Sequence, residues 1–220
     1  MKYPIFFFII TAALIYNLID GMNFLLIYPI LTGILLFLAY LTNRPNLIIG
    51  KNENGAYNKP LMLFSLPWLL ITYTVWFITN YLSRENKVDK ITDSIDIGCY
   101  PFNVNHRKYD LIIDLTSEFP RAYKLDAPYL CLPNLDGINL KNIEIPVNAT
   151  RDSKILIHCA QGHGRSATYC SILMVKLGIV KNGLDALNII LKNRPGAKPS
   201  RIQYEQIKRA QQLDTSETMT

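Results

Sequence analysis

The sequence has few charged residues, and they are unevenly placed. Only 18% of the 220 residues are Asp, Glu, Lys or Arg, against roughly 25% in an average soluble domain. Residues 1–82 hold six of the forty charged residues, whereas 83–220 hold thirty-four, an ordinary soluble density. The chain therefore divides into two parts near residue 83. This division excludes a single water-soluble globule, a disordered chain and a fibrous repeat.

Cysteine and clustered basic residues are also scarce. Four cysteines in 220 residues are too few for a small disulfide-stabilised scaffold. The net charge of +6 is spread thinly along the chain, which argues against nucleic acid as a partner and suits a chain beside anionic lipid headgroups. The three histidines have neither HxH nor HExxH spacing, so we expect no metal and no cofactor.

Long apolar runs without internal charges fill the first part, at about 4–19, 24–41 and 61–82. Each run approaches the ~20 residues that a helix needs to cross roughly 30 Å of hydrocarbon. We therefore expect about three transmembrane helices in residues 1–82 and an integral, multi-pass membrane protein. A cleaved signal peptide is the competing interpretation of the first run. Because no charge lies inside the runs, a transport pathway has no residues to carry it.

The second part, 83–220, has the pattern of one α/β domain. Short apolar runs suit the buried strands of an α/β sheet, and we expect strands at about 95–99, 111–115, 129–132 and 154–158. Helices are expected at about 165–177, 184–193 and 201–213. Gly178 is suited to close the first helix, Pro195 to end the second and Ser200 to cap the third.

The connection between the last strand and the first helix, 158–166, reads HCAQGHGRS. Gly162 and Gly164 allow successive backbone N–H groups to turn inward as an anion-binding nest. The helix that begins near Arg165 adds the positive end of its dipole, and the guanidinium can bind two phosphate oxygens. The segment therefore predicts a phosphate-binding loop. Its residues between Cys159 and Arg165 are Ala160, Gln161, Gly162, His163 and Gly164.

Cys159 is exposed to the same electrostatic field. A free thiol has an ordinary pKa of ~8.5 and is mostly protonated at neutral pH, but a helix N-terminus and a nearby cation favour the nucleophilic thiolate. We expect Cys159 to attack a bound phosphate, and Ser166 to donate a hydrogen bond to the sulfur when it leaves. The remaining cysteines, Cys99, Cys131 and Cys170, are expected to be buried as small apolar residues.

This segment resembles the signature loop of the cysteine-dependent protein-tyrosine phosphatase superfamily, and the flanking order resembles its dual-specificity branch. The resemblance covers roughly 93–213 and includes the segments 114–118 and 193–196. It implies a central sheet of four or five strands flanked by helices. It also implies metal-free hydrolysis of phosphate monoesters through a phosphocysteine intermediate, with His158 supporting the loop and His163 on its variable face.

Two related arrangements also use Cys, five residues and Arg. Low-molecular-weight phosphatases place the cysteine near the start of the domain, whereas here most of the domain precedes Cys159. Rhodanese-like phosphatases share the loop length, but Asp136 upstream and three expected helices downstream favour the dual-specificity order. The resemblance does not extend to residues 1–82.

Such a reaction needs a carboxylic acid that protonates the leaving oxygen and then activates water. The family places this Asp on a loop after a strand, upstream of the cysteine, and Asp136 matches that place. Asp136 lies 23 residues before Cys159, fewer than the family usually has, so we expect the intervening helix to be trimmed. Asp126 and the absence of a dedicated acid are the alternatives.

Two substrate classes fit a phosphatase near a membrane. One is a phosphotyrosine protein, or a phosphoserine or phosphothreonine protein. The other is a singly phosphorylated lipid such as phosphatidylglycerophosphate, which a mitochondrial and bacterial group of similar phosphatases hydrolyses. Phosphoinositide-cleaving relatives tend to carry lysines where Ala160 and His163 stand, which disfavours a polyphosphorylated headgroup.

A different class of function is a catalytically inactive, membrane-tethered module that binds phosphate without hydrolysing it. The reactive thiolate bears on location, because in an oxidising compartment Cys131 or Cys170 could form a disulfide with Cys159. A cytosolic face is therefore favoured for the catalytic part. The sequence does not determine the oligomeric state.

Overall fold

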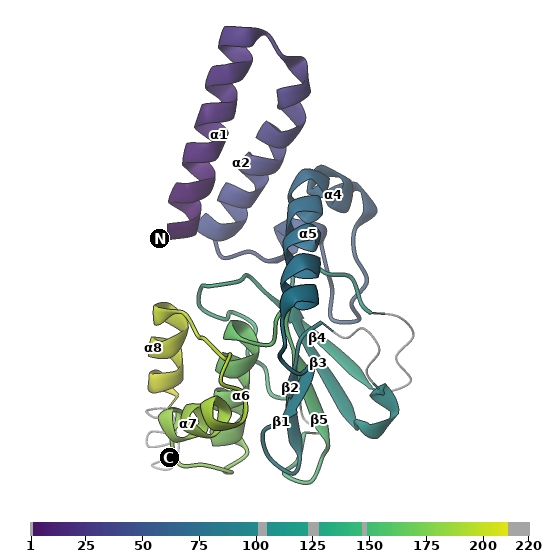
Figure 1. Cartoon of the computed structure of the whole chain (residues 1–220), viewed down its shortest axis with the longest axis vertical. Helices are drawn as coiled ribbons and strands as arrows, with labels where there is room; N and C mark the ends of the chain where they lie inside the picture. Colours follow the sequence, from purple (N-terminus) through teal and green to yellow (C-terminus); the bar gives the residue numbers. More distant parts are fainter. Residues whose placement is uncertain (1, 101–104, 123–127, 147–148, 211–220) are drawn as a thin grey trace, which may run out of the picture. The chain divides into compact units, whose positions relative to one another are not determined.

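The computed structural model describes residues 2–100, 105–122, 128–146 and 149–210 (Figure 1). They group into two compact units, Met1–Ser83 with Ser117–Pro120, and Arg84–Thr116 with Arg121–Thr220. Asp126 and the expected end of the last helix, 211–213, lie outside the described residues.

The first unit begins with a helical hairpin. Helix α1 (Lys2–Gly21) runs beside the short 3₁₀ helix η1 (Phe24–Leu26) and α2 (Ile27–Leu41), as Figure 1 shows. The helices approach closely at Gly33, where an added Cβ would lie 2.2 Å from Thr11 Oγ1. Lys2–Gly21 and Phe24–Leu41, of 20 and 18 residues, are long and apolar enough to cross a membrane, as expected for the first two runs.

The third apolar run does not form one helix of spanning length. After the short α3 (Asn46–Ile49), it folds as α4 (Lys59–Phe64) and α5 (Leu66–Leu82), which are separated at Ser65. Helix α5 has 17 residues, and most of its large apolar side chains are exposed. The expectation of three spans is therefore corrected to two helices of spanning length among the described residues.

Pro67 explains the break in the third run. Proline has no N–H, so the carbonyl of Leu63 loses its helical donor. The Tyr28 hydroxyl on α2 donates to this carbonyl instead, and Thr32 Oγ1 donates to the Phe64 carbonyl at 2.6 Å. Helix α2 thus satisfies the backbone groups that the break frees, as an apolar surrounding would require.

The second unit contains a five-stranded sheet of order β1-β2-β5-β3-β4. Strand β1 pairs antiparallel with β2, and the remaining pairs are parallel. The four expected strands are confirmed, with their bounds correct to within two residues. Strand β1 was missed because its sequence, Val-Asp-Lys, contains no apolar run. The strands are β1 (Val88–Lys90), β2 (Ile95–Gly98), β3 (Leu111–Thr116), β4 (Tyr129–Asn134) and β5 (Ile155–His158).

Three helices follow the sheet and group on one side of it in Figure 1: α6 (Gly164–Lys176), α7 (Gly183–Asn193) and α8 (Arg201–Arg209). A short 3₁₀ helix, η2 (His106–Lys108), precedes β3. Helix α6 is buried from Arg165 to Val175 and supplies much of the core against β3 and β5. The expected caps are confirmed: Gly178 has a φ of +62° after α6, and Ser200 forms a capping box with Gln203 on α8.

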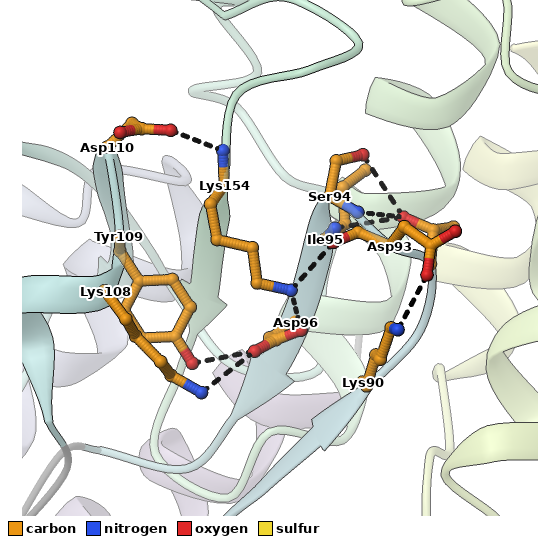
Figure 2. A network of polar contacts seen from close by, with 10 residues as sticks. Lys90, Asp93, Ser94, Ile95, Asp96, Lys108, Tyr109, Asp110 and Lys154 are labelled. Carbon is orange, nitrogen blue, oxygen red and sulfur yellow. Dashed lines mark hydrogen bonds and ion pairs between the residues drawn. The ribbon is translucent and has the colours of Figure 1, made fainter.

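A buried carboxylate links β2 to its neighbours (Figure 2). Asp96 lies on β2 with its side chain only 5% exposed. Lys154 Nζ approaches one oxygen at 2.7 Å, and the Tyr109 hydroxyl donates to the other at 2.8 Å. Lys108 Nζ lies 3.4 Å from the latter oxygen. These contacts compensate the cost of burying the negative charge.

We expect Lys154→Met to destabilise the sheet by about 2 kcal/mol, because it removes the nearest cation from a buried carboxylate that keeps its other two partners. Lys90→Met is the control, since Lys90 pairs with Asp93 at 2.6 Å and both side chains are exposed to solvent. This variant should change the stability little. Hydrogen exchange of β2 and β5 amides in the full chain measures both. Equal effects of the two variants would contradict the assignment.

Candidate active site

The loop that follows β5 lies at the carboxyl edge of the parallel strands, where ligands of open α/β sheets bind. Cys159 follows β5 directly, and α6 begins at Gly164. No side chain caps α6 at His163, so the first N–H groups of the helix keep their capacity for an anion. The strand, loop and helix expected from the sequence are thus confirmed around Cys159.

Gly162 allows the loop to turn tightly over its support. Its φ is +73°, and an added Cβ would lie 2.5 Å from the Gly98 carbonyl oxygen, so only glycine fits there. The Gly162 N–H donates to Cys159 Sγ at 3.2 Å, a contact that stabilises a thiolate. The Tyr100 N–H donates to the Ala160 carbonyl at 3.0 Å and fixes the start of the loop to the end of β2.

Arg165 is almost completely buried, with 1% of its surface exposed. Its Nη1 donates to the carbonyl of Asn134 at 2.9 Å and to that of Leu115 at 3.4 Å. Its Nε lies 3.2 Å from Asp136 Oδ1. The structure therefore brings Asp136 to the phosphate-binding loop, with the carboxylate itself 61% exposed.

Asn134 organises the turn that carries Asp136. Its Oδ1 accepts from the N–H groups of Lys141 and Asn142, and its Nδ2 donates to the carbonyls of Leu132 and Asn142. Sequence analysis missed Asn134, although a polar residue at the end of a buried strand was a usable signal. The short spacing predicted a trimmed helix between β4 and β5, and among the described residues there no helix occurs.

Arg194 supports the loop from beneath, a role that sequence analysis did not assign. Its Nε donates to the Gly162 carbonyl at 2.8 Å and its Nη2 to the Gln161 carbonyl at 3.0 Å. Asp89 on β1 neutralises the guanidinium at 2.6 Å. Because the carbonyls of Gln161 and Gly162 point to Arg194, this part of the loop can direct its N–H groups to the opposite side.

A buried acid lies beside His158, the residue that precedes Cys159. Asp114 on β3 is register-paired with His158 on β5, and Asp114 Oδ1 lies 3.9 Å from His158 Nδ1. Asp114 also accepts from the Thr116 N–H and hydroxyl and from the Tyr129 hydroxyl. This network fits the expected supporting position of His158, and the acidic residue inside an apolar strand was its only sequence signal.

Two further loop side chains differ in their surroundings. Ser166 is fully buried, and its Oγ has no hydrogen-bond partner among the residues that the structure describes, so it is available to the sulfur of Cys159. His163 faces outward and its Nε2 lies 2.7 Å from Glu85 Oε2. Glu85 was not singled out from the sequence, because it lies 78 residues from His163.

All four cysteines are buried and free of disulfides, as expected for Cys99, Cys131 and Cys170. Burial raises the pKa of the Cys99 thiol, although Lys87 and Arg194 oppose this effect. Burial likewise raises the pKa of Cys170 inside α6. Both thiols are therefore neutral at physiological pH.

Solved structures resemble the second unit. Human DUSP28 matches with a TM-score of 0.50 and 15% identity, covering 60% of this chain and 97% of the other. PTPMT1 in complex with PI(5)P matches with a TM-score of 0.51 and 17% identity, covering 60% of this chain and 99% of the other. The second unit has a dual-specificity-phosphatase-like fold. No protein-family model and no curated protein matches this phosphatase-like chain in sequence.

We expect iodoacetamide to modify Cys159 before the other cysteines at neutral pH. Burial raises the pKa of Cys99 and Cys170 and keeps them unreactive, whereas Cys159 lies in the loop between β5 and α6, where its Sγ accepts from the Gly162 N–H. Peptide mass spectrometry of the native chain measures the order, and inorganic phosphate should slow labelling of Cys159 alone. Faster labelling of Cys99 or Cys170 would contradict this assignment.

Gly162→Ala should abolish the protection of Cys159 by phosphate, or require at least about tenfold more phosphate, because the added Cβ displaces the loop from Gly98 and Arg194. Gly178→Ala is the matched control, since Gly178 also has a positive φ, +62°, but lies after α6. The control should retain protection. Equal protection in Gly162→Ala would show that the loop tolerates a side chain there.

Proposed function

We propose that the chain is a membrane-anchored phosphatase that hydrolyses phosphate monoesters through a phosphocysteine intermediate. The observation that carries the proposal is the convergence of Cys159, Arg165 and Asp136, with Asp136 Oδ1 3.2 Å from Arg165 Nε. The fold of the second unit supports it.

In the first step, the Cys159 thiolate attacks phosphorus while the bond to the leaving oxygen breaks. Arg165 and the N–H groups of the loop bind the phosphate oxygens and stabilise the charge of the transition state. Protonated Asp136 gives its proton to the leaving oxygen, so that an alcohol or phenol departs instead of an anion. The products of this step are the free alcohol and phosphocysteine.

In the second step, the Asp136 carboxylate accepts a proton from water as the water oxygen attacks phosphorus. The S–P bond breaks, inorganic phosphate forms and the thiolate is regenerated. The buried Ser166 hydroxyl, which has no partner among the described residues, donates a hydrogen bond to the departing sulfur. Every step uses side chains of this chain and water.

The membrane anchor consists of the α1–α2 hairpin, whose two helices have spanning length and large exposed apolar side chains. We place the phosphatase unit on a cytosolic face, where a reactive thiolate stays reduced. Anchoring raises the local concentration of phosphorylated lipids and of phosphorylated membrane proteins alike. The complex of PTPMT1 with PI(5)P indicates that this fold accommodates a phosphorylated lipid.

The test uses the full chain in mixed micelles of detergent and phospholipid. Phosphate release is measured from a phosphotyrosine peptide and from phosphatidylglycerophosphate at equal concentration. We expect release by the wild-type chain, none by Cys159→Ser, and a loss of about 10²-fold in Asp136→Asn. Asp152→Asn, which changes an exposed Asp beside β5, should be fully active.

The substrate that is hydrolysed faster indicates what the membrane anchor is for. Faster release from the lipid indicates an enzyme of membrane-lipid synthesis, and faster release from the peptide indicates a signalling phosphatase. Equal rates for wild-type and Cys159→Ser would overturn the proposed hydrolysis. In that case, phosphate binding by Cys159→Ser would support the inactive binding module instead.

A further inference from the structure

The turn that carries Asp136 is held at a second point, by a residue outside the turn. We define the acid loop as residues 135–142. Gln206 on α8 meets the acid loop at Leu140: its Oε1 accepts from the Leu140 N–H at 2.8 Å, and its Nε2 donates to the Leu140 carbonyl at 2.8 Å. The two residues are 66 positions apart in the sequence. We infer that Gln206 is a positioning residue that holds Asp136 over the leaving-group oxygen.

The paired contact restricts the acid loop more than a single hydrogen bond would. A primary amide that binds both backbone groups of one residue fixes the orientation of that residue as well as its distance. Leu140 is 3% exposed, so its N–H and carbonyl would be costly to leave unpaired. Asn134 closes the acid loop by binding Lys141 and Asn142, and Gln206 binds the adjacent Leu140 from α8. Asp136 lies in the sequence between Asn134 and Leu140.

Helix α8 is itself fixed relative to the phosphate-binding loop. Its first turn is closed by the Ser200–Gln203 capping box, and Gln203 Oε1 lies 3.0 Å from the position of a Cβ on Gly164. Near its other end, the Ile207 carbonyl oxygen lies 2.2 Å from the corresponding position on Gly183 of α7. A side chain at Gly183 would force α7 and α8 apart, and one at Gly164 would require the Gln203 side chain to shift, so α8 packs closely against both α7 and the start of α6.

One helix therefore contacts both halves of the site. Its N-terminal turn abuts the start of α6, which carries Arg165, and Gln206 one turn later binds the acid loop. This arrangement sets the separation between the proton donor and the thiolate. No helix between β4 and β5 is present in the described residues to support the acid loop, which leaves this task to Asn134 and Gln206.

The inference rests on the proposed function, and its signature is a dependence on the leaving group. Phenyl phosphate releases a basic phenoxide that needs a proton in the transition state, whereas 2,4-dinitrophenyl phosphate releases a stable anion that does not. A variant that misplaces Asp136 should fail selectively on phenyl phosphate. A variant that merely weakens the fold should lose both activities together.

The experiment measures kcat and KM of the full chain in detergent micelles for both substrates. Gln206→Met keeps the length of the side chain and removes both hydrogen bonds. We expect kcat/KM for phenyl phosphate, which reports only the steps up to phosphocysteine formation, to fall about tenfold or more, with kcat/KM for 2,4-dinitrophenyl phosphate changed less than about twofold. Glu205→Met, at the exposed neighbouring position on α8, is the matched control and should behave as wild type.

Two further variants keep the test decisive. Gln206→Glu retains the acceptor for the Leu140 N–H and loses the donor, so its loss on phenyl phosphate should be intermediate even if Gln206→Met folds poorly. Gln206→Met combined with Asp136→Asn should be no slower on phenyl phosphate than Asp136→Asn alone, because the two residues act as one unit.

The outcomes separate this inference from the function on which it rests. A wild-type chain without turnover, or Asp136→Asn without a selective loss on phenyl phosphate, would overturn the proposed mechanism. In another outcome, the wild-type chain is active and Asp136→Asn is selectively slow on phenyl phosphate. If the Gln206 variants then lose activity equally on both substrates, that result would overturn the role of Gln206. Additive losses in the double variant would do the same.

Discussion

The buried guanidinium of Arg165 is the constraint around which the second unit is arranged. A charge with 1% exposure needs partners for its donors, since an unpaired buried charge is very costly. Its Nη1 donates to the carbonyls of Leu115 and Asn134, which lie at the ends of β3 and β4, and Asp136 Oδ1 lies near its Nε. Strands β3 and β4 therefore end at the same edge of the sheet as β5, and that edge carries the candidate site.

A second buried arginine gives the phosphate-binding loop its direction. Arg194 donates to the carbonyls of Gln161 and Gly162, and Asp89 balances its charge. These contacts hold the carbonyls of Gln161 and Gly162 against Arg194 and fix the orientation of the loop. The close approach of Gly162 to Gly98 completes this packing and leaves no room for a side chain.

The first unit exposes many large apolar side chains, so a different rule would apply to it in a bilayer. Backbone polar groups there have to be satisfied within the protein. The α1–α2 hairpin does so through its helical hydrogen bonds, and the break at Ser65 is tolerated because Tyr28 and Thr32 of α2 supply donors to the freed carbonyls. Helix α2 therefore serves both as a candidate span and as the support of the third run.

The sequence by itself determined the features that depend on neighbouring residues. Charge density divided the chain, apolar runs marked the strands, Gly178 and Ser200 marked helix ends, and the spacing from Cys159 to Arg165 predicted the phosphate-binding loop. Tertiary packing alone brings together the distant residues that surround the loop after β5 and the turn with Asp136, namely Asp89, Asn134, Arg194 and Gln206. Their contacts join residues 31 to 105 positions apart. Such pairs leave no local pattern, because a single polar side chain has no periodicity and its partner is chosen by the packing of strands and helices.

The break in the third run shows both levels: Pro67 is visible in the sequence, but the donors that make the break stable come from another helix.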